Sequence, residues 1–197
     1  MRKKLLVVLL LGLAVVSVMK AQEHNSAITT NIFNLFIALP SAEFETKIAD
    51  NMGLFGSLRF GSYEIGDFKT SIFGVSAGVD IYPGKSEGIE GFYIGPMLYL
   101  NQMTVTFKSI GYYDYTDIWN PVYVPGKTED VSGSMLGPMC RIGYRWDWGG
   151  FAFSPSAQLG FIVGKIESSI TDAAGQKMEL KYGGFSFGLG LNMGVAF

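Results

Sequence analysis

The stretch from Phe185 to Phe197 reads FSFGLGLNMGVAF, and it decides the fold class. Every odd position carries an apolar side chain, whereas the even positions carry Ser, Gly, Asn or Ala. Successive side chains of a β-strand point to opposite faces, so the pattern predicts a strand with one apolar face and one nearly bare face. The strand is long enough to cross a bilayer, which takes roughly 9–11 tilted residues. A bare face suits the crowded interior of a narrow barrel, because glycine and other small residues need little volume.

The alternative for this stretch is the terminal strand of a soluble β-sandwich, with its second face in water. A water-facing strand surface favours Lys, Glu, Thr and Asn, whereas this one is mostly glycine and alanine. The pattern therefore favours a membrane barrel over a sandwich.

The other end of the chain has the layout of a secretory signal peptide. Basic residues at positions 2–4 precede an apolar run over 5–18, and a small residue follows at position 21. The run is shorter than the about 20 residues of a spanning helix, although a retained anchor helix is the alternative. No cysteine lies near the junction, which argues against a lipoprotein. We expect a signal peptide over residues 1–21 and one outer-membrane β-barrel domain over residues 22–197.

Charge and composition narrow the class further. Loss of residues 1–21 would remove four basic residues and no acidic one, leaving 11 basic residues against 17 acidic residues and no basic run. Nucleic acid is therefore not an expected partner, because phosphate binding needs a clustered basic surface. The chain has 26 glycines and 14% aromatic residues, which is typical of a β-protein with many turns and aromatic girdles at lipid level. Beyond residue 21 no apolar run is long enough for a spanning helix, so any spanning element there must be a strand.

Alternating patterns separated by turn residues predict eight strands. They cover residues 27–39, 43–48, 52–63, 70–82, 91–106, 132–146, 151–167 and 185–197. The first is apolar on both faces, so its register stays open. We expect a polar connection over 64–69 and the longest irregular segment over 107–130. Pro96, inside the fifth strand, removes one ladder donor and weakens the strand or marks a bulge.

Eight antiparallel strands put both chain ends on one side, which in outer-membrane barrels is the periplasm. Turns near residues 50, 83 and 147 then lie in the periplasm, and connections near residues 40, 64, 107 and 168 lie outside. An aromatic girdle is expected at the periplasmic rim. The residues that fall at this rim are Ile81, Phe92, Trp146, Phe151 and Phe197, of which all but Ile81 are aromatic.

The whole chain after residue 21 resembles the small eight-stranded bacterial outer-membrane barrels of the OmpA, OmpX and opacity-protein type. The resemblance rests on the signal peptide, the strand count, the loop asymmetry and the C-terminal ending. In that ending an aromatic terminus follows apolar residues at alternate positions, which are Leu191, Met193, Val195 and Phe197. The resemblance implies recognition by the barrel-assembly machinery, residence in outer-membrane lipid and a monomer. It is architectural and names no activity.

Residues for catalysis and metal binding are sparse. The known enzymes among such barrels, lipid A deacylases and palmitoyltransferases, phospholipases and omptin proteases, depend on a catalytic histidine. This chain has one histidine, His24, before the first expected strand. The single cysteine, Cys140, can neither form an internal disulfide nor complete a metal cluster with a lone histidine. No phosphate-binding loop is present, and the glycines are spaced as strand glycines are. We therefore predict no enzyme activity, no cofactor and no metal site.

Charged residues alternate with the apolar positions and are expected inside the barrel. They are Glu43, Glu45, Lys47, Arg59, Asp80, Arg141 and Arg145. An unpaired charge sealed in a narrow barrel costs several kcal/mol, so these residues should pair into a plug. The alternative is a gated ion or solute path lined by Arg141 and Arg145. An eight-stranded barrel is only just wide enough for its side chains, which favours the plug.

The segment from residue 107 to 130 is the candidate external binding surface. Its aromatic residues are Tyr112, Tyr113, Tyr115, Trp119 and Tyr123. Tyr and Trp are enriched in recognition surfaces because they offer large rigid contact area with a polar tip. The alternative is that these rings sit at the membrane interface or pack within the loop. An extracellular protein or glycan is the partner that such a surface would suit.

The sequence thus predicts an all-β, eight-stranded antiparallel up-and-down transmembrane barrel with a structural or surface-interaction role. One alternative is a small pore for ions or solutes. Another is a soluble secreted barrel that holds a lipid, but that fold would turn the polar face outward. An enzyme acting on lipid is the remotest of the alternatives.

Overall fold

The computed structural model describes residues 24–84, 88–108, 112–114, 120, 122–124, 126, 128–171 and 177–197. The expected signal peptide lies outside these residues. Among the helices within them, none is long and apolar enough to span a membrane.

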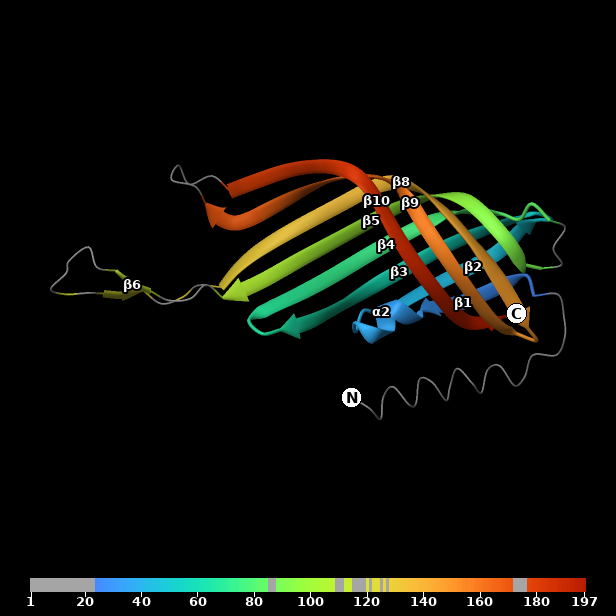
Figure 1. Ribbon diagram of the computed structural model, residues 1–197, viewed down its shortest axis with the longest axis horizontal. Helices are drawn as coiled ribbons and strands as arrows, with labels where there is room; N and C mark the ends of the chain where they lie inside the picture. Colours follow the sequence, from blue (N-terminus) through green and yellow to red (C-terminus); the bar gives the residue numbers. More distant parts are fainter. Residues whose placement is uncertain are drawn as a thin grey trace, which may run out of the picture.

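Eight antiparallel strands close into a barrel, which confirms the predicted all-β antiparallel fold (Figure 1). Strands adjacent in the ring follow one another along the chain, and the first pairs with the last. The barrel strands are β1 (Ser26–Asn31), β2 (Ser41–Ala49), β3 (Met52–Ile65), β4 (Phe68–Ile81), β5 (Gly91–Lys108), β8 (Thr128–Trp148), β9 (Phe151–Thr171) and β10 (Lys177–Ala196). Between β1 and β2 lies a short helix, α2 (Ile32–Phe36). Between β5 and β8, the strands β6 (Tyr112–Asp114) and β7 (Val122–Val124) form a small antiparallel ribbon.

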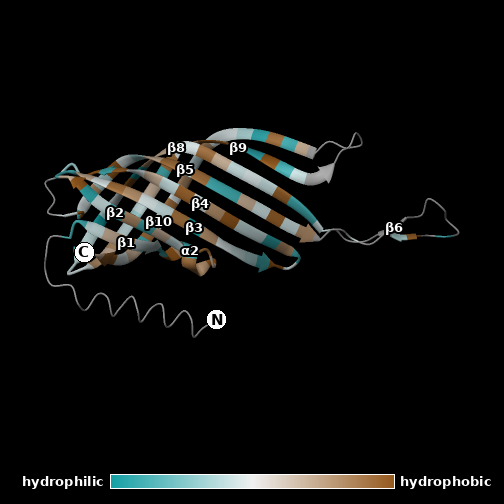
Figure 2. Cartoon of the chain, turned by 180° about the vertical axis from the view of Figure 1, so that it is seen from behind, coloured by the Kyte–Doolittle hydropathy of each residue, from teal (hydrophilic) through white to brown (hydrophobic). Residues whose placement is uncertain are grey.

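The two faces of each strand differ as the alternation predicts. On β10, Phe185, Phe187 and Leu189 are more than 60% exposed on the outside, whereas Asn192 and Ala196 are buried inside. Residues of contrasting hydropathy follow one another along the strands in Figure 2. The barrel therefore has an apolar exterior and a small-residue, polar interior.

Both ends of the described chain meet at one end of the barrel, here called the terminal rim. Phe197 N–H donates to the Ser26 carbonyl at 2.8 Å, and Ser26 N–H donates back to Phe197 at 2.9 Å. The β2–β3, β4–β5 and β8–β9 connections lie at this rim, whereas the β3–β4 turn lies at the opposite end, here called the far rim. The β8–β9 turn consists of Gly149 and Gly150 with φ of 63° and 95°, as a two-residue hairpin turn requires.

Aromatic side chains gather at the terminal rim, where the sequence predicts them. Trp146 and Trp148 stack with ring centroids 6.3 Å apart, and Trp148 stacks on Phe151 at 6.1 Å. Phe153 lies 5.8 Å from Trp146. These four rings form a continuous patch at the ends of β8 and β9.

The first expected strand, over 27–39, is wrong beyond Asn31. The Asn31 side-chain oxygen accepts N–H bonds from Phe33 at 3.0 Å and Asn34 at 3.4 Å, so it caps a helix instead of continuing a ladder. The structure also settles the open register, because Thr29 is 2% exposed inside and Ile28 is 48% exposed outside.

The expected connection over 64–69 is also wrong, because β3 and β4 continue through it and leave only Gly66 and Asp67 as a turn. Gly66 has φ of 60°, which lets the strands reverse within two residues. Glu64 and Lys69 are consequently opposite each other, with charged atoms 3.8 Å apart. Charged residues here mark a strand end and not a loop.

The expected irregular segment over 107–130 is shorter than predicted. The β5–β8 ladder extends to the pair Lys108 and Thr128, and β6 and β7 occupy part of the remainder. Likewise β10 begins at Lys177, well before residue 185. At the far ends of β5 and β8 most residues on both faces are polar, so little hydropathy contrast marks these strand ends. In β10 the alternation does continue, because Met178 and Leu180 are 60% and 63% exposed between charged neighbours.

Pro96 lies where the β4–β5 ladder is interrupted, but it does not produce a bulge. The β4–β5 pairing is missing at residues 79–80 and 95–96, yet the register is the same on both sides. At Gly95 an added Cβ would lie 1.7 Å from the Val79 carbonyl oxygen. Close approach of the two backbones therefore requires glycine at this position.

The barrel wall is uneven in height. β1 has 6 residues and β2 has 9, whereas β8 and β9 have 21 each and β10 has 20. In Figure 1 α2 lies partway along the barrel, where the long strands continue past it. The wall made by β1 and β2 stops well short of the far rim.

Candidate binding site in the barrel lumen

A cluster of charged residues fills the lumen nearest the terminal rim. Arg141, from β8, reaches across to β2 and β4, where its guanidinium contacts Glu43 at 2.7 Å, Glu45 at 3.3 Å and Asp80. Arg145, two inward positions along β8 from Arg141, pairs with Glu45 at 2.6 Å and Glu43 at 3.5 Å. We call these five residues the lumen charge cluster.

Burial of this cluster is nearly complete. Arg141, Arg145, Glu45 and Asp80 are at most 1% exposed, and Glu43 is 9% exposed. Three carboxylates face two guanidinium groups, so each cation is shared by more than one anion. Removing charges from water costs several kcal/mol per ion, and this cost is offset only when every charge has close partners.

Aromatic rings and hydroxyls complete the packing around the cluster. The Arg141 guanidinium lies 3.7 Å from the Phe55 ring centroid and 5.0 Å from that of Tyr93. The Tyr82 hydroxyl donates to Glu45 at 2.5 Å. The cluster and these rings together fill the lumen next to the terminal rim.

Two of the seven predicted lumen charges lie elsewhere. Lys47 is half-buried on β2 nearer the terminal rim, where its backbone N–H donates to the Asn25 carbonyl at 2.7 Å. Arg59, on β3, donates to the Tyr99 hydroxyl at 2.5 Å and to the Asn101 side-chain oxygen at 3.1 Å. The structure thus brings five of the seven charges together and sets Arg59 apart.

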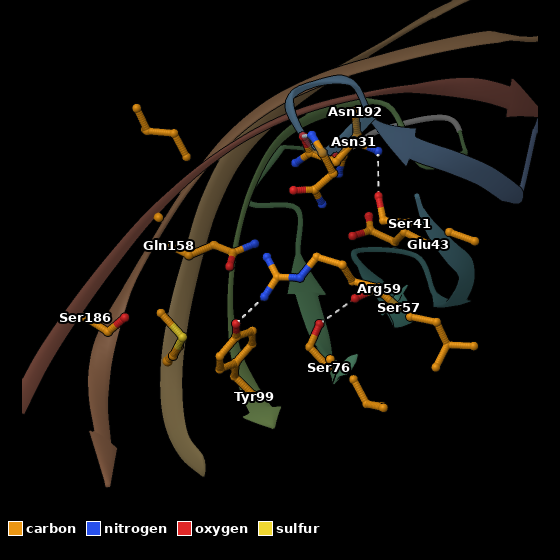
Figure 3. Close-up of a pocket in the computed structure, with 18 of the residues that line it drawn as sticks. Asn31, Ser41, Glu43, Ser57, Arg59, Ser76, Tyr99, Gln158, Ser186 and Asn192 are labelled. Carbon is orange, nitrogen blue, oxygen red and sulfur yellow. Dashed lines mark hydrogen bonds between the residues drawn. The ribbon is translucent and has the colours of Figure 1, made fainter. Parts of the chain in front are cut away.

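A polar cavity of about 220 Å³ surrounds Arg59 beyond the charge cluster (Figure 3). Most of its polar lining is neutral. That lining comes from Asn31, Asn34, Ser41, Ser57, Ser76, Tyr99, Gln158, Ser186 and Asn192. In the close-up, Arg59 extends toward Tyr99 and Gln158 from the opposite wall. We call this space the Arg59 cavity.

Arg59 is the cation of this cavity, and it forms no ion pair within the described part of the chain. Among the described residues no carboxylate lies within 4.0 Å of the Arg59 guanidinium, and its Nε is buried without a hydrogen-bond partner. The one carboxylate in the lining, Glu43, is directed to Arg141 and Arg145 instead. The cavity therefore presents a guanidinium that has neutral hydrogen-bond partners and no directly bound acid from the residues that the structure describes.

The sequence analysis missed the neutral members of this cavity. Tyr99, Asn101, Gln158 and Asn192 occupy inward positions of their strands. The sequence did contain a signal for such a cavity, namely side-chain amides at inward positions between glycine and serine. Glycine and serine alone would have been enough to fill a narrow barrel.

The predicted aromatic binding residues are only partly described. Tyr113 pairs with Tyr123 across the β6–β7 ribbon, Tyr112 is in β6, and Tyr123 is 54% exposed. Tyr115 and Trp119 lie outside the described residues. The ribbon is beyond the far rim and takes no part in the Arg59 cavity.

The C-terminal residues of the predicted assembly signature lie on the outer face of β10. Val195 pairs with Ile28 of β1 and Phe151 of β9, so this end of β10 seals the ring. Phe197 is 42% exposed at the terminal rim. Leu191 and Met193 occupy the same outer face.

His24 and Cys140 lie apart from the lumen charges. His24 is buried at the terminal rim and its Nδ1 contacts the Asp147 carboxylate, while Asp147 also accepts the Gly150 N–H at 2.9 Å. Cys140 is half-buried on β8. No group of three or more metal-ligating side chains occurs within the part of the chain that the structure describes.

Comparisons with known proteins give little beyond the architecture. No protein-family model matches the chain, and no curated protein matches it. Among solved structures, the chain is similar to Acinetobacter baumannii CarO2, with a TM-score of 0.40 and 11% sequence identity over 88% of this chain and 98% of that one. Similarity this low leaves function to be argued from the residues of this chain.

Proposed function

We propose that this chain is an integral outer-membrane β-barrel protein with a closed lumen, which acts at the cell surface without catalysis. The exterior supports the membrane part of the proposal. Large apolar side chains are exposed on every barrel strand, whereas most inward positions carry charged, polar or small residues, with one buried apolar cluster of Phe55, Met97 and Met139 among them. A soluble lipid-binding barrel would need the reverse arrangement, with an apolar interior. Outer-membrane lipid is the partner that such an exterior suits.

The orientation follows from the general topology of such barrels. Both chain ends share one rim, and in outer-membrane barrels that rim faces the periplasm. The long far-side extensions of β5, β8, β9 and β10 would then stand outside. Membrane insertion would use the barrel-assembly machinery, acting on the C-terminal strand.

Extraction tests the membrane proposal directly. We expect the protein to require detergent and to migrate faster on gels before heating than after it, because the folded barrel is compact. A protein that dissolves in buffer and shows no heat-dependent mobility would refute membrane residence.

The lumen charge cluster is the single observation that carries the closed-lumen proposal. Glu45, Asp80, Arg141 and Arg145 are almost fully buried and bound to one another across the full width of the barrel. An ion moving along the lumen would have to separate these pairs, which costs several kcal/mol. We expect planar bilayers containing the protein to show no steady single-channel conductance.

The rival function, a small pore, predicts the opposite result. Steady conductance that changes in the Arg141→Ala variant would place the ion path through the cluster and would refute the plug. The Lys69→Ala variant is the matched control, because Lys69 is an exposed cation at the far rim.

The surface role is assigned to the β6–β7 ribbon and the ends of β5 and β8 that support it. The ribbon presents an exposed aromatic side chain beside an exposed aliphatic one, since Tyr123 and Val122 are 54% and 64% exposed. Such a surface suits a protein or glycan partner. Co-purification of envelope or cell-surface molecules should be lost when residues 110–127 are deleted. An unchanged set of co-purified molecules would refute this assignment.

The proposal of a non-catalytic role rests on the position of the only histidine. His24 is paired with Asp147 at the terminal rim, away from the cavity and from the far side. Purified protein should therefore give no turnover of phospholipid or lipid A. Measured turnover would refute the non-catalytic role.

A further inference from the structure

The short β1–α2–β2 unit leaves an opening in the barrel wall. β10 pairs with β1 only as far as Asn192, opposite Asn31, and then continues to Lys177. On the other side, β3 pairs with β2 only as far as Arg59 and then continues to Ile65. Within the described residues, the remaining edges of β10 and β3 have no strand between them. We call this interval between the edges of β10 and β3, beyond α2, the wall notch.

The wall notch begins within the apolar layer of the barrel surface. β1 and β10 form five pairs from the terminal rim to the notch, whereas crossing a bilayer takes roughly 9–11 residues per strand. The exterior of β10 stays apolar beyond that level, since Leu189, Phe187 and Phe185 are 65%, 61% and 64% exposed. The notch therefore starts about halfway through the layer that lipid would cover.

An open strand edge in that layer has a physical requirement. Backbone N–H and C=O groups exposed to hydrocarbon cost several kcal/mol each, so unpaired backbone is tolerated at membrane depth only beside protein or a polar, hydrated cavity. The Arg59 cavity supplies such a space, because residues 186–189 of the β10 edge contribute to its lining. The cavity and the notch are therefore parts of one feature.

The cavity and the wall notch differ in polarity: the cavity is polar, and the residues at the notch are apolar. Inside, Arg59 forms no ion pair with a described carboxylate and has a buried Nε without a partner, and neutral amides and hydroxyls around it can donate hydrogen bonds. At the mouth, α2 exposes Phe33, Leu35 and Phe36 by 49%, 45% and 83%. An anionic group inside and a hydrocarbon chain outside match these two environments.

We propose that the Arg59 cavity binds the phosphate or carboxylate headgroup of a membrane amphiphile that enters sideways through the wall notch. The acyl chain stays outside, against α2 and the outer face of β10. The volume of about 220 Å³ is below the roughly 300–1,000 Å³ of pockets that enclose a drug-sized ligand, so it suits a headgroup and not a whole lipid. The inference rests on the proposed membrane location, in which the notch faces the outer leaflet.

Binding can be tested on the full mature chain in micelles of an uncharged detergent by native mass spectrometry. Dodecyl phosphate is the probe, dodecyl maltoside carries the same tail without charge, and inorganic phosphate carries the charge without a tail. We expect one dodecyl phosphate per chain, bound at least ten-fold more tightly than either control compound. Equal binding of dodecyl maltoside would overturn the role of the charge. Equal binding of inorganic phosphate would identify a free anion as the ligand and overturn the role of the membrane amphiphile.

Variants locate the site. Arg59→Gln should weaken dodecyl phosphate binding at least ten-fold, whereas Arg59→Lys should retain most of it. Gly188→Phe should block binding, because position 188 lines the cavity and an added Cβ there meets nothing closer than 3.9 Å. The matched control is Gly184→Phe, at an inward position of the same strand outside the cavity lining, where an added Cβ meets no atom within 4 Å.

Folding of every variant is checked by its heat-dependent gel mobility. Unchanged binding in folded Arg59→Gln, or equal loss in both phenylalanine variants, would overturn the site. A chain that is soluble without detergent would refute the membrane proposal itself. A chain that integrates into membranes but fails to bind dodecyl phosphate refutes only the present inference.

Discussion

Removal of Arg141 should destabilise the barrel strongly, because this residue contacts three buried carboxylates. In Arg141→Met, Glu43 and Glu45 would keep only the guanidinium of Arg145, and Asp80 would lose its ion-pair partner. Breaking a buried pair by removing one partner costs about 3–5 kcal/mol. We expect the free energy of unfolding to fall by that amount.

Urea unfolding of the protein in detergent micelles measures this effect. With a slope of about 2 kcal/mol per molar urea, the midpoint should fall by about 1.5–2.5 M. The double variant Arg141→Met with Asp80→Asn removes one charge of each sign, so it should recover at least half of the loss. An exposed pair gives the control, because Lys69→Met should change stability by about 0–1 kcal/mol.

A loss of less than about 1 kcal/mol of unfolding free energy in Arg141→Met would refute a sealed charge cluster, since removing one partner of a buried ion pair costs more than that. A double variant as unstable as the single one would refute it as well. Either result would mean that water reaches the carboxylates and that the cluster is not a sealed plug.

Three further predictions concern the wall and the terminal rim. Gly95→Ala should lower the free energy of unfolding by about 1–3 kcal/mol in urea, because its Cβ would lie 1.7 Å from a backbone oxygen of the neighbouring strand. Gly56→Ala is the control, because an added Cβ there meets no atom within 4 Å, and it should change stability by less than about 0.5 kcal/mol. Equal losses of stability in the Gly95 and Gly56 variants would refute the steric argument. His24→Leu should cost about 1.5–3 kcal/mol of unfolding free energy through loss of its contact with Asp147, and an unchanged midpoint would contradict this. Deletion of Phe197 should slow insertion into membranes, followed by gel mobility, without abolishing strand formation; an unchanged insertion rate would count against its role in assembly.

Much of the barrel could be predicted from local pattern. Phe185, Phe187 and Leu189 alternate with small residues, and a period of two has only one regular backbone that satisfies it. The prediction was weakest where the contrast between faces disappears. At the far ends of β5 and β8 most residues on both faces are polar, so backbone pairing and not hydropathy extends these strands. At Glu64 and Lys69 the charged residues suggested a loop, although their neighbours Ile65 and Phe68 continue the apolar outer face.

The candidate site was predictable only in part. That Arg141 and Glu43 face the interior followed from their alternation with apolar neighbours, but they are 98 residues apart in sequence. Which charges meet depends on the relative register of β2, β4 and β8, which no local pattern contains. Arg59 alternates in the same way as Arg141, yet its place in the ring gives it Tyr99 and Asn101 as partners instead of acids.

The sequence by itself determined which side chains face outward or into the lumen, the number of barrel strands and the rim that the two ends of the barrel domain share. These depend on side-chain alternation and on turn residues, which act over a few positions. Only the tertiary structure decided where β1 stops, which charges pair and where the wall opens. The reason is that these features depend on the stagger between strands from distant parts of the chain, and on the local competition at Asn31, whose side chain caps a helix where the ladder could have continued.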